Sequence, residues 1–212
     1  MSAMRVFMFA LSIVLCGPAV TGVRAADQAA TPTKPGQTAD KVKEAALGPL
    51  APQDEQLDQL YARLKRERNP QVARAIADQI RETLTLSGSA TVDMLMANCS
   101  KALEEKRYGA ALDFADQVTL LAPKYPEGWN RRATIHYLMG NYGKSMSDVA
   151  RTLALEPRHL GALSGLAGIL EDSGHDAQAL KAWQTYLSYY PADRDAQKEA
   201  FDLTDKLSGQ KT

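Results

Sequence analysis

The sequence predicts an all-helical solenoid, and three observations point to it. Pro123, Pro157 and Pro191 follow one another at intervals of 34 residues. Between these prolines, apolar residues recur three and four positions apart, which is helical spacing, and Gly140 and Gly174 interrupt two of the units near their middle. A period of this length indicates stacked helix-turn-helix units, because one hairpin alone cannot bury both of its apolar faces.

Composition sets limits on the function. Of the 212 residues, 45% are hydrophobic and 24% are charged, which suits a globular protein with a substantial core. Lysine and arginine together number 25, and so do aspartate and glutamate. No excess of positive charge therefore predicts a nucleic-acid partner.

Residues 1–25 resemble a secretory signal peptide. Arg5 precedes an apolar run over 6–16, and small residues near Ala25 predict cleavage after that residue, hence a periplasmic location. An uncleaved membrane anchor is one alternative, although the run is short against the ~20 residues that span a bilayer. A lipoprotein attached through Cys16 is another, although Leu15 stands where such signals carry a small residue.

The remaining chain divides into a linker, a folded domain and a short tail. Residues 26–52 contain four prolines and no sustained apolar period, which predicts a disordered linker. The folded domain is expected over 53–208, with a frayed tail at 209–212. Its first helix, from Asp54, carries Leu57, Leu60, Tyr61 and Leu64 on one face. Asn69 and Pro70 are expected to begin the second helix, which ends near 87–89.

Three further hairpins and a last helix follow. The hairpins are expected at 91–123, 126–159 and 160–191, in phase with the prolines. In the helix at 192–208, Ala196, Ala200, Leu203 and Leu207 line one face, and the other face is charged. This pattern suits a helix that caps the end of a stack. Cys99, the one cysteine outside the leader, occupies a small-residue position and is predicted to be buried.

The third hairpin resembles a tetratricopeptide repeat (TPR). Its aromatic, small, turn-glycine, second aromatic, apolar and closing-proline positions are filled by Trp129, Ala133, Gly140, Tyr142, Val149 and Pro157. The fourth hairpin matches again, and the match is weakest in the first. The resemblance covers about residues 54–208. It implies an all-α, right-handed α-solenoid of about four repeats, the first degenerate, plus the C-terminal capping helix. Trp129, Tyr142 and Trp183 are expected to fill spaces between helices.

The resemblance also implies a binding groove. In this family the first helix of each pair lines a concave surface that holds a peptide. The matching positions here are Met96, Ser100, Glu127, Asn130, Thr134, Tyr137, Gly161, Ser164, Gly168 and Glu171. The lysine and asparagine pattern that grips a C-terminal carboxylate is missing from them, which argues against a chaperone-tail binder. Gly161, Gly165 and Gly168 share a helix face, which predicts close approach of either a neighbouring helix or a partner.

No motif predicts an enzyme, a metal site or a cofactor. His136 is expected to pack in the core, and His159 and His175 fall in turns and are expected to be solvated. No two histidines have the spacing of a helical metal site, and neither a nucleophile turn nor a phosphate-binding glycine loop is present in the sequence.

The sequence therefore predicts a non-enzymatic periplasmic protein–protein interaction module. Under this interpretation it is a TPR adaptor or scaffold in cell-envelope assembly or integrity, with an envelope protein's peptide or helix in its groove. The alternative is a structural subunit that self-associates within a secretion or outer-membrane complex.

Overall fold

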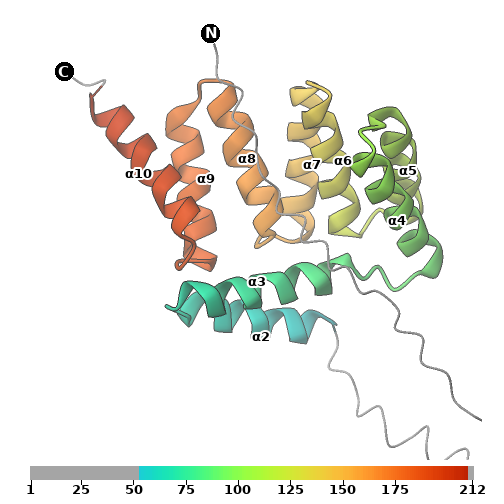
Figure 1. The fold of residues 1–212 in the computed structure, drawn as a ribbon, viewed down its shortest axis with the longest axis horizontal. Coiled ribbons are helices and arrows are strands. Elements are labelled where there is room, and N and C mark those ends of the chain that lie inside the picture. Colours follow the sequence, from blue (N-terminus) through green and yellow to red (C-terminus); the bar gives the residue numbers. More distant parts are fainter. Residues whose placement is uncertain (1–52, 210–212) are drawn as a thin grey trace, which may run out of the picture. The chain divides into compact units, whose positions relative to one another are not determined.

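The computed structural model describes residues 53–209. The expected leader (1–25) and linker (26–52) lie outside the described residues, as does 210–212 of the expected tail. The described part contains nine helices and no strand, so the all-α class is confirmed (Figure 1). The helices are α2 (Gln53–Arg66), α3 (Pro70–Thr85), α4 (Ala90–Glu104), α5 (Tyr108–Leu121), α6 (Pro126–Leu138), α7 (Tyr142–Leu155), α8 (Leu160–Asp172), α9 (Asp176–Tyr189) and α10 (Arg194–Gly209). None of these helices has the length and apolar character needed to cross a bilayer.

Helices α4 to α9 form three consecutive hairpins, and α10 packs against α9 as the expected capping helix. Each hairpin pairs its own two helices and also contacts the next hairpin, α5 against α6 and α7 against α8. The helical solenoid expected from the 34-residue period is thereby confirmed. Asn69 caps α3 as predicted, because its side-chain oxygen accepts hydrogen bonds from the backbone N–H groups of Gln71 (2.9 Å) and Val72 (3.2 Å).

The turn inside each hairpin requires a residue in the left-handed region. Gly140 and Gly174 have φ values of 75° and 74°, and the equivalent residue of the first of the three hairpins is Lys106, with φ 55°. Glycine adopts this conformation without steric cost, whereas a side chain at Cβ is crowded against the following carbonyl. The α4–α5 turn therefore carries backbone strain that the other two turns avoid.

Replacing Lys106 with glycine is expected to stabilise the protein by about 1 kcal/mol, since it relieves the left-handed strain. Urea denaturation followed by circular dichroism measures the change. Lys101→Gly, in the last turn of α4, is the matched control and is expected to lose about 1 kcal/mol, because glycine lowers helix propensity. A destabilisation by both substitutions would contradict strain at Lys106.

The first hairpin, α2–α3, does not stack in front of α4–α5, which corrects the expected position of the degenerate first repeat. Instead α2 packs against α9 and α3 against α6, and the hairpin runs beside the loops that join successive pairs (Figure 1). The apolar stripe of the hairpin is buried instead in a cluster shared with α8, α9 and α10, which offers far more apolar surface than the exposed side of α4, where Thr91, Asn98 and Lys101 accompany Met94.

Three inter-repeat loops hold the α2–α3 hairpin. Tyr125, before α6, donates its hydroxyl to the backbone oxygen of Thr85 at the end of α3 (2.7 Å). Between α7 and α8, Arg158 forms an ion pair with Asp58 (2.5 Å), and its backbone oxygen accepts the hydroxyl of Tyr61 (2.9 Å). The guanidinium of Arg158 also lies over the Tyr61 ring, 4.4 Å from its centroid.

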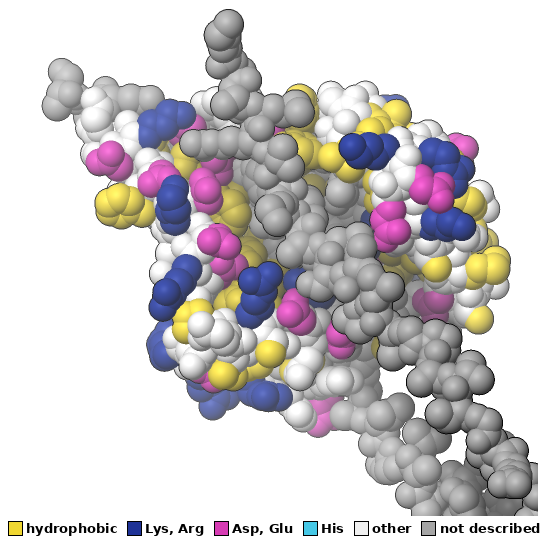
Figure 2. All heavy atoms as spheres, viewed as in Figure 1, with side chains coloured by type: hydrophobic (Ala, Val, Ile, Leu, Met, Phe, Trp, Pro, Cys, Tyr) yellow, Lys and Arg dark blue, Asp and Glu magenta, His cyan; other side chains and the backbone are white. Residues whose placement is uncertain are grey.

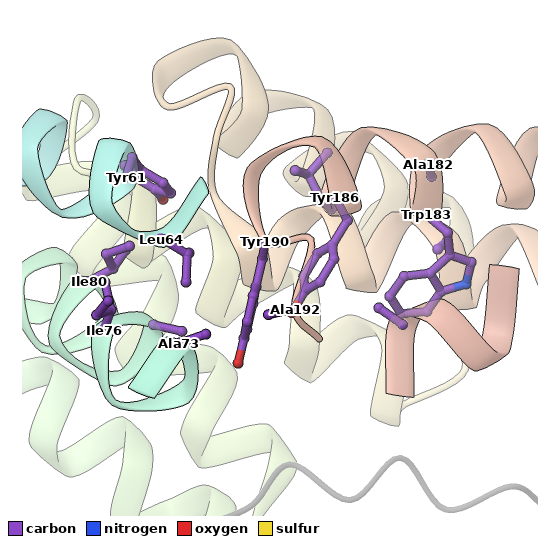
Figure 3. Close-up of a cluster of buried hydrophobic side chains, with 14 of the residues drawn as sticks. Tyr61, Leu64, Ala73, Ile76, Ile80, Ala182, Trp183, Tyr186, Tyr190 and Ala192 are labelled. Atoms are coloured by element: carbon purple, nitrogen blue, oxygen red, sulfur yellow. The ribbon is translucent and has the colours of Figure 1, made fainter. Parts of the chain in front are cut away.

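The third loop, between α9 and α10, contributes apolar contacts. Tyr190 stands between the α3 side chains Ala73 and Ile76 on one side and Tyr186 of α9 on the other (Figure 3). The buried cluster here is the largest of the described residues and joins α2 and α3 to α8, α9 and α10. The stripe predicted for the first helix is buried in it, namely Leu57, Leu60, Tyr61 and Leu64.

Two of the three large aromatics expected between helices lie elsewhere. Trp183 is buried as predicted, with 6% of its surface exposed. Trp129 is only half-buried, because Arg132 and Arg151 cover its ring while its indole N–H donates to the oxygen of Pro123. Tyr142 is 44% exposed at the start of α7.

Cys99 is buried as predicted. Its Sγ donates to the backbone oxygen of Ala111 (3.4 Å), and burial raises the pKa of the thiol to about 11. The side chain is therefore a protonated, packed group at neutral pH, which favours a structural role over a reactive one.

Candidate functional site

The candidate surface lies on α6 and α8, the first helices of two neighbouring hairpins. Its residues are half-buried and polar: Asn130, Thr134 and Tyr137 on α6, and Ser164 and Glu171 on α8. We refer to these five residues as the α6–α8 face. They project from adjacent helices because both helices open their hairpins at the same point of the 34-residue period. Two polar clusters, one at each end, join the two helices.

The first cluster is built on the buried carboxylate of Glu127, in the first turn of α6. This carboxylate accepts hydrogen bonds from the side chains of Asn130 (3.0 Å) and Arg131 (2.9 Å) on its own helix. From the start of α8, Nε2 of His159 lies 3.1 Å from the second carboxylate oxygen. Glu127 and His159 are 6% and 3% exposed, so the cluster is shielded from solvent. Glu127, which the sequence predicts to face the groove, is therefore buried where two repeats meet.

The burial of His159 corrects the expectation that it is solvated. Its Nδ1 accepts the backbone N–H of Ala162 (3.1 Å), which makes His159 the side-chain cap of α8. Because Nδ1 acts as an acceptor, the ring proton lies on Nε2 and is donated to Glu127. The imidazole is therefore held in one orientation between a helix start and a carboxylate.

The pKa of Glu127 reflects this environment. Burial alone raises the pKa of a carboxyl group, but the hydrogen bond from His159, the positive charge of Arg131 and the bond from Asn130 outweigh it. The net effect lowers the pKa of Glu127 from 4.5 to about 2. The carboxylate consequently stays ionised at all physiological pH values and acts as a structural anion.

The second cluster joins the far ends of the two helices. The hydroxyl of Tyr137 on α6 donates to a carboxylate oxygen of Asp172 at the end of α8 (2.6 Å). The rings of Tyr137 and Tyr142 meet edge to face, 5.6 Å apart. Next to Asp172, Glu171 accepts the indole N–H of Trp183 (2.7 Å), so this end is tied to the core of α9. The sequence had given no sign of the role of Asp172.

The three glycines of α8 occupy different environments. A Cβ on Gly161 would lie 3.4 Å from both Nδ2 of Asn130 and Cε1 of His159, so the absence of a side chain lets α6 and α8 approach. Gly168 is buried. A Cβ on Gly165 would meet no atom within 4 Å, so this residue borders open space. Close packing explains Gly161, and Gly165 remains compatible with a surface on which a partner lies.

The two α4 candidates are placed apart from this face. Met96 is 4% exposed and packs with Val92, Val118 and Tyr125 in a core cluster, where a partner does not reach it. Ser100 is half-buried in the second half of α4. The hydroxyls of Thr134 and Ser164 donate to oxygens of their own helices, at Asn130 (3.0 Å) and Gly161 (3.1 Å), and keep their lone pairs as acceptors.

Arg131 and Arg132, the two basic residues that follow the groove position Asn130 on α6, are both engaged. Arg131 pairs with Glu127. Arg132 makes a two-point contact with Asp148 (both 2.8 Å) and a further ion pair with Asp116 (2.9 Å), which joins α5, α6 and α7. This second network lines a cleft of about 330 Å³, together with Leu112, His136, Lys144 and Ser147.

His136 packs as expected for a core histidine. It is 6% exposed, and its buried Nδ1 has no partner among residues 53–209. Burial lowers the pKa of the imidazole, so the ring is neutral at pH 7. His175 is exposed at the start of α9, as expected. In the described part of the chain, no three histidine, cysteine, aspartate or glutamate side chains are grouped as metal ligands would be.

Comparison with known proteins identifies the family. A TPR repeat-containing protein of Rhizobium etli is 54% identical over 158 residues, which cover 74% of this chain and 78% of the relative. This chain belongs to the TPR repeat-containing proteins. A small glutamine-rich TPR protein of Mycosarcoma maydis is 26% identical over 119 residues, which cover 56% of this TPR chain and 34% of that protein. No family model matches the sequence.

Solved structures agree with the TPR fold. The first TPR domain of Spaghetti (RPAP3), solved with the HSP90 peptide SRMEEVD, has a TM-score of 0.53 at 19% identity and covers 55% of this chain and 93% of that chain. The TPR domain of Sgt2 from Aspergillus fumigatus has a TM-score of 0.54 at 19% identity and covers 58% and 83%. The TPR solenoid is confirmed, and with it the class of protein–protein interaction module.

Proposed function

We propose that this TPR protein is an exported, non-enzymatic adaptor of the cell envelope that holds a partner protein on the α6–α8 face. The observation that carries the proposal is the bracing of this face. Glu127 and His159 fix one end, and Tyr137 and Asp172 fix the other. Polar groups held at fixed separation by buried or packed supports lose little entropy when they bind, which favours recognition of a partner segment.

The chemistry of the face favours the backbone and small side chains of a peptide or helix. Asn130 supplies an amide, and Thr134 and Ser164 supply acceptor lone pairs along the two helices. The basic side chains beside it are already paired, Arg131 with Glu127 and Arg132 with two aspartates. We therefore infer a partner bound through neutral polar contacts and not through a terminal carboxylate, although the RPAP3 neighbour was solved with an acidic HSP90 peptide.

A bulky substitution on α8 tests the binding face. Gly165→Leu adds a side chain where a Cβ meets no atom within 4 Å, so it fits the fold and protrudes beside Ser164. Gly109→Leu on α5 is the matched control, because Gly109 also borders open space but lies on the second helix of its pair. We expect Gly165→Leu to lower the recovery of the partner from envelope extracts at least tenfold, about 1.4 kcal/mol, and Gly109→Leu to leave it unchanged.

Equal recovery of the partner by the two leucine variants would place the binding surface elsewhere. Sedimentation of the purified protein separates the adaptor from the self-associating subunit: a monomer at all concentrations supports the former, and a stable oligomer the latter. The exported location is tested by fractionation and N-terminal sequencing of the cellular protein. A periplasmic chain that begins at Ala26 is expected, and an intact cytoplasmic chain would overturn export.

A further inference from the structure

Five basic side chains gather at the end of the α2–α3 hairpin where the chain reverses. They are Arg63, Lys65, Arg66, Arg68 and Arg74, and we refer to them as the basic turn. All five are exposed, and within residues 53–209 none of them forms an ion pair. Figure 2 shows Lys and Arg side chains gathered at the lower left, over this hairpin. The basic turn lies on a different element from the α6–α8 face.

The fold accounts for only part of this charge. Arg63, Lys65 and Arg66 occupy the last turn of α2, where positive charge favours the helix dipole. Arg68 lies in the loop and Arg74 in the second turn of α3, where the dipole gives no such benefit. Five exposed cations without carboxylate partners repel one another. A negatively charged partner outside the chain would relieve this repulsion.

The nearby carboxylates are occupied by other contacts. Glu67 is the single acidic residue among 63–74, and its oxygen accepts the backbone N–H groups of Arg68 and Asn69 (2.8 Å each). Elsewhere in the hairpin, Asp58 pairs with Arg158 and Asp78 with Arg81. In the neighbouring α9–α10 loop, Asp193 accepts the Tyr186 hydroxyl. The basic turn therefore keeps its full positive charge.

We propose that the basic turn docks the protein on a membrane surface rich in anionic phospholipid headgroups. The cations stand on long, solvent-exposed side chains around a rigid base, since Leu64, Ala73 and Ile76 of the same segment are buried in the core. Such an arrangement suits a diffuse layer of negative charge better than a shaped partner. Val72, 45% exposed in the first turn of α3, adds an apolar group at the same end.

A nucleic acid fits this surface less well. The segment 62–75 contains no aromatic residue on which a base could stack, and the closest ring on α2, Tyr61, is buried. A folded acidic protein would require cations held in a fixed pattern, whereas these five side chains have no ion-pair supports in the described residues. Negatively charged lipid requires only proximity and charge.

Vesicle sedimentation with the full chain tests the proposal. The probes are phosphatidylcholine vesicles with and without phosphatidylglycerol. Each lysine or arginine near an anionic bilayer strengthens binding about fivefold. The triple variant Arg63→Gln, Arg66→Gln, Arg68→Gln is therefore expected to bind the anionic vesicles on the order of a hundredfold more weakly than the wild type. Added salt is expected to weaken the binding of the wild-type protein to anionic vesicles and to weaken the binding of the variant less.

The matched control removes three exposed lysines from other elements: Lys101→Gln, Lys124→Gln, Lys181→Gln. It changes the net charge equally and keeps residues 1–52 identical, so non-specific attraction and any binding by the N-terminal segment affect both triples alike. Unchanged binding by this control supports the proposal. Equal losses by the two triples, or equal binding of wild type to both vesicle types, would overturn it. Binding to DNA or to an acidic protein without binding to anionic vesicles would also overturn it.

Discussion

Replacing Trp183 with alanine is expected to lower the free energy of unfolding by about 3–5 kcal/mol. The ring is 6% exposed in the largest apolar cluster, edge-on to Tyr186 at 5.5 Å (Figure 3). Its N–H also donates to Glu171, so the substitution leaves a cavity and removes this hydrogen bond. Urea denaturation followed by far-ultraviolet circular dichroism measures the loss.

The companion variant is Trp129→Ala, for which a loss of about 1 kcal/mol is expected. Trp129 is half-buried, and its removal chiefly abolishes the stacking of two guanidinium groups on its ring. Arg132 lies 4.7 Å and Arg151 5.8 Å from the ring centroid, and such contacts are worth about 0.5–1 kcal/mol at an exposed site. Sequence alone predicts equal losses for the two tryptophans. Equal measured losses would contradict the placement of Trp129 at the surface of the repeat.

Replacing Glu127 with glutamine is expected to cost about 3 kcal/mol at neutral pH. The amide removes the charge that balances Arg131, and its NH₂ group faces the Nε2 proton of His159 in place of an acceptor. Glu104→Gln is the matched control, because Glu104 is exposed at the end of α4. That control is expected to change the unfolding free energy by less than about 0.5 kcal/mol.

The stabilisation from Glu127 should depend on pH in a defined direction. Its pKa is lower in the folded protein, about 2, than the ordinary 4.5. A lowered carboxyl pKa contributes stability that is fully present above the ordinary value and is lost as the pH falls towards the folded one. The difference between wild type and Glu127→Gln should thus be constant from neutral pH to about 4.5 and shrink between 4.5 and 2. A difference that stays constant through this acid range would show that the carboxylate is not specially stabilised.

The repeats can be predicted well from the sequence because each one is specified by residues close to one another in the chain. The 34-residue period places the turns at Gly140 and Gly174, and the helix stripes identify the apolar faces. The position of α2–α3 could not be found in this way. A stripe such as Leu57, Leu60 and Leu64 shows which side of a helix is buried and does not show which surface covers it. The cluster that buries this stripe includes Tyr186 and Tyr190, more than a hundred residues away.

The sequence predicts which helices carry the candidate site, but it does not predict what the individual residues of the site do. Family positions correctly indicate α6 and α8 as neighbouring helices, but they give no sign that Glu127 is buried under His159. One signal was present in the sequence. Tyr125, His159 and Asp193 precede equivalent helices at intervals of 34 residues, and each makes a structural hydrogen bond in the folded chain. Residues before a helix in a repeat therefore merit the same attention as those on its inner face.

The strap formed by α2–α3 changes how the solenoid should unfold. In a simple repeat stack each unit contacts only its neighbours, so the ends fray and partly folded states are populated. Here the Tyr61–Arg158 contact spans 97 residues of chain, and the Tyr125–Thr85 contact ties the same hairpin to the opposite part of the stack. Each of the three loop contacts therefore links the folding of the hairpin to a different part of the stack. We therefore expect the strap to couple the repeats into one cooperative unit and to slow folding, because contacts distant in sequence must form before the stack is complete.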